Sequence, residues 1–141
     1  MKPLTPAVLD RAAGYRLVGE IQDEQEQLAV LGRLDELAPG FPDWIVTALF
    51  GGTYQREGLA LRDRQVANLA ALTAMGGVEP QLATHVRVSL RVGMAREEIV
   101  EVMTHLAPYV GVPRALAGLR VVAAVLADQD GDQDAEQDGE R

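Results

Sequence analysis

The sequence predicts an all-α fold, and three observations support that prediction. Aromatic residues make up only 4% of the 141 residues although 48% are hydrophobic, so the core must be built from Ala, Leu and Val. Such small aliphatic side chains favour closely packed helices over a sandwich of sheets. Apolar residues also recur at helical spacing between Gly and Pro stops, and no convincing strand pattern appears.

The first forty residues predict a long helical region. Thr5 is a suitable N-cap, Pro6 fits the first helical position, and the region runs from there to about Leu37. The sequence does not decide whether this region is broken near Gly19. Proline and glycine at residues 39–42 end the region, and a short apolar helix then runs to a glycine pair at positions 51 and 52.

Four sharper helix signals follow residue 58. The first helix, residues 61–75, has its apolar stripe at Val66, Leu69, Ala70 and Thr73 and ends at a Gly-Gly pair. The second opens at Pro80 and closes at Gly93. The third, residues 96–107, begins with acids in its first turn, where the helix dipole favours them. Glycine and proline at positions 111 and 113 separate it from the last helix, residues 114–127.

The charge of the chain is unevenly distributed. The net charge is −8, of which residues 128–141 contribute −6 with seven acids and one arginine. Such a polar segment cannot offset its ordering entropy, so we expect a single domain over residues 1–127 and an acidic disordered tail over residues 128–141. The acidity and the absence of a basic stripe argue against nucleic acid as a partner.

The chain contains no cysteine, which excludes disulfides, thiolate nucleophiles and thiolate metal sites together. The N-terminus lacks the apolar run of a signal peptide, and no window approaches the length needed to span a membrane. We therefore expect a soluble, cytoplasmic protein.

His85 is the first candidate for acid–base chemistry. It lies at the margin of the apolar face of its helix, which is formed by Leu82, Val86, Ser89 and Leu90. A histidine at such an edge can keep one ring nitrogen bonded and the other free for proton transfer. It can equally be a core-edge histidine that is satisfied by its neighbours.

His105 is the second candidate. It lies off the apolar stripe of its helix and one turn after Glu101, whose carboxylate can orient an imidazole and raise its pKa. An ordinary surface pair is the alternative, and in an oligomer this face can also meet a partner subunit. Two histidines twenty residues apart, without a third ligand nearby, do not predict a metal site.

Arginines are the candidates for binding a carboxylate, because the guanidinium fork matches its two oxygens. Arg62 and Arg64 begin one helix, while Arg87 and Arg91 lie opposite the buried face of another. Solvation at the surface explains all four equally well. Tyr109, just before the turn at Gly111, can donate its hydroxyl or serve as a packing residue.

Motifs between residues 56 and 113 occur together in one known family. In order they are Arg56, Gly58-Leu59, Arg62, Arg64, the segment ANLAALTAMG, Gln81-Leu82, His85-Val86-Arg87, Gly93, Glu97–Val102, His105, Tyr109, Gly111 and Pro113. Over roughly residues 40–126 the chain resembles the carboxymuconolactone decarboxylase family, within the alkylhydroperoxidase D superfamily. The resemblance implies an all-α protomer that associates through helices into a homo-oligomer, either a trimer or a hexamer.

The peroxidase branch of this superfamily uses a Cys-x-x-Cys pair ahead of the histidine that matches His85. The corresponding segment here, residues 78–81, is Val-Glu-Pro-Gln and has no thiol. The acidic proton-relay residue of that branch falls near Gln65, and glutamine cannot shuttle protons as a carboxylate does. Thiol peroxidase activity is therefore unavailable to this chain.

The decarboxylase branch implies a cofactor-free carboxy-lyase in aromatic compound catabolism that acts on 4-carboxymuconolactone or a related small carboxylated lactone. The lactone ring accepts the electrons, so no cofactor and no metal is expected. The resemblance implies proton transfer or oxyanion stabilisation by His85, with His105 and Glu101 as the second candidates. Arg56, Arg64 or Arg87 would hold the substrate carboxylate.

The chain departs from the decarboxylase pattern at several positions. Decarboxylases carry an aromatic pair within residues 44–56, Asn-Gly in place of Val92-Gly93, and glutamine in place of His105. These departures indicate a different lactone or a β-keto-type acid as substrate. They also keep open an alternative, a non-catalytic oligomeric binding or accessory protein on the same scaffold.

Overall fold

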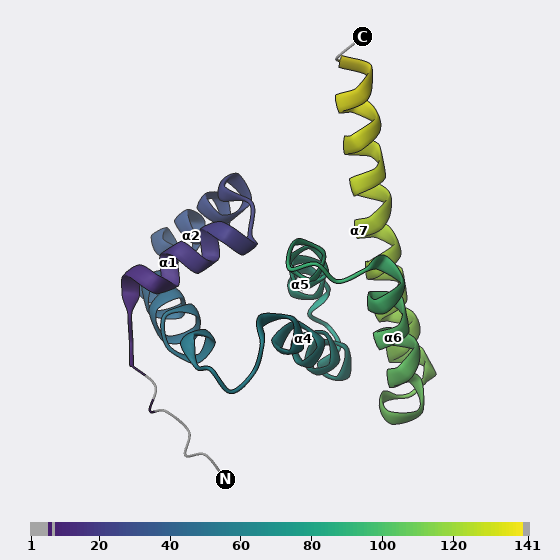
Figure 1. Cartoon of the computed structure of the whole chain (residues 1–141), viewed down its shortest axis with the longest axis horizontal. Coiled ribbons are helices and arrows are strands. Elements are labelled where there is room, and N and C mark those ends of the chain that lie inside the picture. The colour runs from purple at the N-terminus through teal and green to yellow at the C-terminus, as the bar shows by residue number, and fades with distance from the viewer. Residues whose placement is uncertain (1–5, 7, 140–141) are drawn as a thin grey trace. The chain divides into compact units, whose positions relative to one another are not determined.

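The computed structural model of the chain describes residue 6 and residues 8–139, and it describes side chains for residues 6, 8–23, 27 and 31–131. Within this part of the chain every regular element is helical, and the all-α prediction is confirmed (Figure 1). The elements are α1 Arg11–Ile21, α2 Glu24–Leu37, α3 Phe41–Ile45, a π-helix Val46–Phe50 (η1), a 3₁₀ turn Thr53–Gln55 (η2), α4 Leu61–Met75, α5 Glu79–Arg91, α6 Arg96–Val110 and α7 Val112–Gly139. No helix over the described residues is long and apolar enough to cross a membrane.

The chain divides into two compact units, Met1–Leu61 and Arg62–Arg141, which we call the N-terminal and C-terminal units. Each unit has its own packing, so each is described by itself. The expectation of one domain over residues 1–127 stays a prediction.

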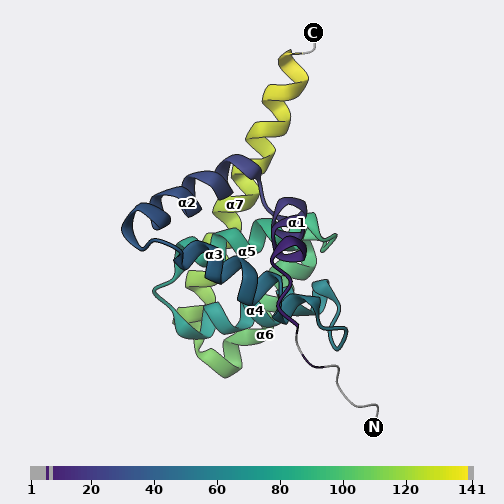
Figure 2. The ribbon, with the colours of Figure 1, turned by 90° about the vertical axis from the view of Figure 1, so that its left-hand side faces the viewer.

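The N-terminal unit begins its first helix later than the sequence predicts. Thr5 lies outside the described residues, Pro6 is not helical, and α1 starts at Arg11 because the Asp10 carboxylate accepts a hydrogen bond from the Ala13 amide at 2.8 Å. The open question near Gly19 is also answered, since α1 continues past it to Ile21 and ends at the extended residue Gln22. Figure 2 shows α2 running from this break towards α3.

Glycine allows α1 to pack closely on the π-helix η1. A Cβ atom at Gly14 would lie 2.6 Å from the carbonyl oxygen of Val46, and one at Gly51 would lie 2.2 Å from the carbonyl oxygen of Asp10. Both distances are too short for a carbon, so the glycines here serve close backbone approach. The contact is completed by the Asp10 amide, which donates to the Gly51 carbonyl at 2.8 Å.

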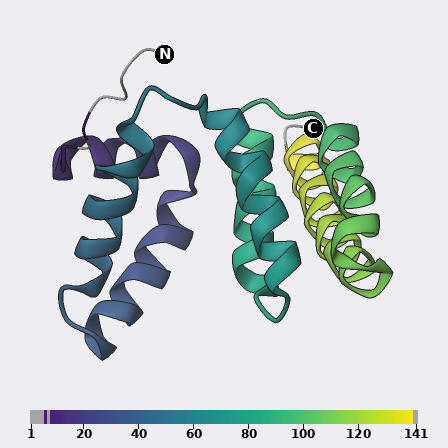
Figure 3. The ribbon, with the colours of Figure 1, turned by 90° about the horizontal axis from the view of Figure 1, so that it is seen from below.

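The C-terminal unit has an aliphatic core to which all four of its helices contribute. Figure 3 shows α6 and α7 side by side, and the core residues are Leu69, Leu82, Val86, Met94, Ile99, Met103, Val122 and Val125. Gly118 brings α7 close to its neighbours, because a Cβ there would lie 2.9 Å from the Sδ of Met103 and 3.3 Å from the Cγ2 of Thr73. The predicted core of Ala, Leu and Val is found in part: five of these eight residues are Leu or Val, while Met94, Ile99 and Met103 supply the rest and none is Ala.

In the C-terminal unit, α4 and α5 end at the glycines where the sequence predicts helix ends. Gly76 and Gly93 have φ angles of +67° and +87°, which a side chain would disfavour, and they follow α4 and α5. The acids at the start of α6 also act locally, since the Glu98 carboxylate accepts from the Ala95 amide at 2.8 Å and pairs with Arg62.

The last helix is longer than the sequence predicts. Residues 114–127 were the expected helix, whereas α7 runs from Val112 to Gly139 and includes most of the acidic segment (Figure 2). No proline interrupts this segment, and the Asp130 carboxylate forms an ion pair with Arg96 at 2.5 Å. The backbone of residues 128–139 is therefore helical in this structure, and the disordered acidic tail remains a prediction about the chain in solution.

Candidate functional site

The central contact of the candidate site joins α4 to α5 within the C-terminal unit. The Nδ1 atom of His85 lies 2.9 Å from the Oε1 atom of Gln65 and 3.4 Å from the Nδ2 atom of Asn68. Gln65 and Asn68 are three residues apart on α4, so both side chains point to the same side of that helix. One ring nitrogen of His85 is thus held between two amide side chains.

The local sequence explains why Gln65 lies in the core. Gln65, Leu69 and Thr73 are spaced four residues apart on α4, and all three are buried. Gln65 is fully buried, and its Nε2 atom has no hydrogen-bond partner among the described residues. The buried face of α4 therefore carries an amide at a position where an aliphatic side chain would pack without an unpaired donor.

His85 lies at the edge of the buried face of α5, as the sequence predicts. Its neighbours Leu82, Val86 and Ser89 are buried, while His85 itself is half-buried. The Ser89 hydroxyl donates to the His85 carbonyl at 2.7 Å, which fixes the backbone at this point. Burial lowers the pKa of the His85 imidazole below its usual 6.5, so the neutral ring predominates at pH 7.

His105 and Glu101 are both exposed on α6. Among the described residues no hydrogen bond or ion pair joins them, and the His105 ring instead lies 5.3 Å from the ring of Tyr109. Tyr109 is exposed as well. The structure thus groups His105 with Tyr109 on the surface of α6.

The three predicted carboxylate-binding arginines lie in different places. Arg56 belongs to the N-terminal unit, where it follows η2, and Arg64 is next to Gln65 in the first turn of α4. Arg87 is two residues beyond His85 on α5, and its Nη2 atom is 4.0 Å from the Asp128 carboxylate. All three have interactions within the protein, so a substrate carboxylate would have to exchange with existing partners.

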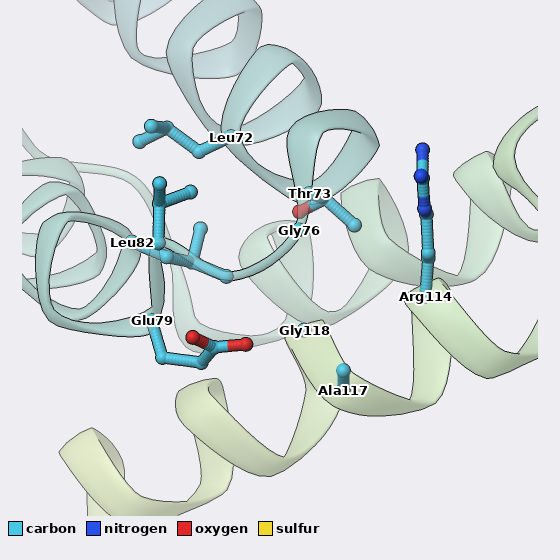
Figure 4. A pocket seen from close by; sticks show the side chains of 9 residues that line it. Leu72, Thr73, Gly76, Glu79, Leu82, Arg114, Ala117 and Gly118 are labelled. Atoms are coloured by element: carbon cyan, nitrogen blue, oxygen red, sulfur yellow. The ribbon is translucent and has the colours of Figure 1, made fainter.

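A small pocket lies elsewhere in the C-terminal unit, between the end of α4, the start of α5 and α7. Figure 4 shows Leu72 and Leu82 on one side of it and Arg114 on the other. Its volume of about 30 Å³ is enough for one or two water molecules. The Arg114 guanidinium donates to the Ala74 carbonyl, and His85 does not line the pocket. No group of three or more metal-ligating side chains occurs over residues whose side chains are described.

Sequence reasoning located His85 but missed Asn68 and the contact between Gln65 and the ring. The predicted stripe of α4 used Val66, Leu69, Ala70 and Thr73, whereas the buried face is Gln65, Leu69 and Thr73. A signal was available, since Gln65 stands one helical turn before Leu69, Asn68 follows Gln65 by three residues, and the next helix contains a single histidine.

Comparison with known proteins identifies the family. Residues 39–124, more than half of the chain, match the model of the carboxymuconolactone decarboxylase family. The chain belongs to this family. Gln65, Asn68 and His85 all lie inside the matched region. The predicted family membership, for a chain without cysteine, is confirmed.

Two proteins similar in sequence to this chain are informative. The chain is 32% identical over 98 residues to a protein of Paracoccus denitrificans described as an uncharacterized 15.0 kDa protein in the nqo9-nqo10 intergenic region, covering 69% of this chain and 73% of that one. It is 26% identical over 115 residues to the 4-carboxymuconolactone decarboxylase of Acinetobacter baylyi, covering 82% of this chain and 85% of that one.

Proposed function

We propose that this protein is a cofactor-free decarboxylase, a carbon–carbon lyase acting on 4-carboxymuconolactone or a related small carboxylated lactone. Family membership and the relative of that name in Acinetobacter baylyi support the reaction class. The observation that carries the proposal is the half-buried imidazole of His85, held at Nδ1 by Gln65 in a chain that has no thiol.

The reaction needs a proton carrier and an electron acceptor. The bond between the ring carbon and the carboxylate breaks, carbon dioxide leaves, and the electron pair moves through the ring onto the lactone carbonyl oxygen. The resulting furanolate then takes a proton at its α-carbon. A histidine with one nitrogen held and one nitrogen free can deliver that proton.

His85 fits the role of proton carrier better than His105. Its ring is positioned by two amide side chains and is partly removed from water, which strengthens its interaction with a developing charge. His105 is solvent-exposed, so His105 and Glu101 remain the second candidates. We propose Arg64, next to Gln65, and Arg87, two residues after His85, as ligands of the substrate carboxylate. Arg56 and Tyr109 are the other proposed substrate-binding residues.

The proposed enzyme works as a homo-oligomer, a trimer or a hexamer, in the catabolism of aromatic compounds. An oligomer can complete a site that one protomer leaves open, because two copies meeting at exposed helix faces enclose a volume between them. The small pocket in the C-terminal unit is too small for a lactone with two carboxylates.

The direct test is decarboxylation of freshly generated 4-carboxymuconolactone, followed by the loss of ultraviolet absorbance. We expect turnover by the wild type and a loss of about 100-fold or more in His85→Ala, since general acid–base catalysis contributes about that much. His105→Ala, the matched change at the exposed histidine, should retain most of the activity. Absence of turnover by correctly assembled wild type would contradict the substrate assignment.

A non-catalytic binding or accessory protein on the same scaffold is the second candidate. The observation in its favour is that the pocket between α4, α5 and α7 has room only for one or two water molecules and is not lined by His85. In that case carboxylated lactones would not be turned over, although a lactone that the protein binds would still raise its melting temperature. His85→Ala would then change stability alone.

A further inference from the structure

Two amide side chains compete for a single ring nitrogen of His85. Nδ1 of a neutral imidazole is either a donor that carries a hydrogen or an acceptor with a lone pair, and never both. The Oε1 atom of Gln65 at 2.9 Å requires Nδ1 to donate, whereas the Nδ2 atom of Asn68 at 3.4 Å would require it to accept. The shorter distance lies within the normal range of N–H···O hydrogen bonds and the longer one lies outside it. The contact with Gln65 therefore determines that Nδ1 carries the hydrogen.

The surroundings of Gln65 support a role for its carbonyl oxygen. The side chain is fully buried and its Nε2 atom is unpaired. A buried donor without a partner keeps its full desolvation penalty, and a leucine at this place would avoid that penalty. A buried polar group kept in a destabilising arrangement calls for an explanation, and the hydrogen bond from His85 supplies one.

We propose that Gln65 is a positioning residue that holds His85 as the Nδ1–H tautomer, which leaves Nε2 as the nitrogen that takes up and releases protons. The role of Nε2 in catalysis rests on the proposed function, whereas the tautomer of His85 does not. Nδ1 carries a hydrogen in both the neutral ring and the imidazolium, so Gln65 accepts the same hydrogen bond throughout. Nε2 takes a proton from solvent, and the α-carbon of the furanolate removes it after carbon dioxide has left.

The uncharged amide also bears on the class of substrate. A carboxylate in place of Gln65 would hold the same tautomer but would place a negative charge beside the ring. A glutamine orients the imidazole without repelling an anion, which suits a substrate with two carboxylates. In Gln65→Glu the added negative charge beside the ring would therefore oppose the binding of an anionic substrate at His85.

The tautomer is measured directly by long-range ¹H–¹⁵N correlation spectra of the full-length protein above pH 7. In the wild type we expect Nδ1 of His85 to be pyrrole-like and Nε2 to be pyridine-like. In Gln65→Leu, which keeps the volume and removes the acceptor, the Nε2–H tautomer should become populated. In Gln65→Glu, which keeps an acceptor, Nδ1–H should persist. His105 is the internal control and should not change.

Three results would overturn the proposal. These are an Nε2–H tautomer in the wild type, an unchanged Nδ1–H tautomer in Gln65→Leu, or loss of Nδ1–H in Gln65→Glu. If Gln65→Leu does not fold, Gln65→Glu and the wild type still decide it. The spectra need no substrate. They can therefore contradict the proposed tautomer while decarboxylation is observed, or support the tautomer while no decarboxylation is observed.

Kinetics test the substrate part of the proposal. With a turned-over lactone, Gln65→Leu should lower kcat by about 10-fold or more. Gln65→Glu should restore kcat towards the wild type but raise KM for a dicarboxylate more than for a monocarboxylate analogue. An equal change in KM for both substrates would contradict this effect of charge.

Discussion

His85 illustrates how burial and a neutral partner together set the state of one side chain. Gln65 accepts a hydrogen bond from Nδ1 without adding charge, and burial disfavours the imidazolium. A carboxylate in the same place would oppose the effect of burial. The ring is therefore neutral in the folded protein at a pH where a free histidine is already partly charged.

This difference predicts a pH dependence of stability. The folded-state pKa of His85 lies below the unfolded value of about 6.5, so the unfolded chain binds the proton first as the pH falls. The free energy of unfolding should be highest above pH 6.5 and should fall below it, by no more than about 1.4 kcal/mol per pH unit. Urea denaturation at intervals from pH 7.5 to pH 5 measures it.

Substitutions at the two histidines separate the contributions. His85→Gln should flatten the dependence between pH 7.5 and pH 5, while His105→Gln, at the exposed site, should leave it as in the wild type. The pKa values of Asp43, Glu98 and Asp130 are lowered by hydrogen bonds, so these carboxyls lose their stabilising effect only below this range. An unaltered slope in His85→Gln would show that burial of His85 is not the cause.

At this scale the sequence located His85 at the edge of its helix, since apolar spacing alone defines that edge. It did not predict Asn68 or the hydrogen bond from His85 to Gln65. Periodicity assigns polar residues to the solvent, and Gln65 is a polar residue in the core. Only the packing of α4 against α5 reveals that exception.

Among the helices, the close approach of α7 depends on a single glycine. Gly118→Ala would place a carbon 2.9 Å from the Met103 Sδ and 3.3 Å from the Thr73 Cγ2, both of which belong to the buried core. The clash should outweigh the better helix propensity of alanine and destabilise the protein by about 1–2 kcal/mol. Thermal denaturation followed by circular dichroism measures the change.

The same substitution elsewhere in α7 gives the control. Nothing lies within 4 Å of a Cβ at Gly131, so Gly131→Ala should be neutral or slightly stabilising. Equal melting temperatures for Gly118→Ala and the wild type would mean that α7 can shift away from α6 without loss.

Helix ends were predictable to the extent that local chemistry fixes them. Gly76 and Gly93 were identified because residues with positive φ favour glycine. The start of α1 at Arg11 was missed, since two suitable N-caps compete and the Asp10 carboxylate is the one that bonds the helix. The end of α7 was missed as well, because a lack of apolar residues predicts a lack of packing and does not by itself stop a helix.

For the whole molecule, the exposed apolar side chains bear on assembly. At the junction of α6 and α7, Tyr109, Val112 and Leu116 are 73%, 60% and 45% exposed. Clusters of large apolar residues on a surface are typical of faces that are covered by a partner. For the trimer or hexamer proposed above, light scattering should give a mass of three or six chains of 15.2 kDa.

A charge placed in this cluster tests whether it is the contact. Leu116→Glu should shift the protein towards smaller species, because a buried carboxylate without a partner is strongly unfavourable at an interface. Ala71→Glu introduces the same charge at an exposed position of α4 and should leave the mass unchanged. Circular dichroism shows whether both variants keep their helices. A monomeric wild type at micromolar concentration would contradict the assembly, and a proposed active site that needs two copies would then have to form within one chain.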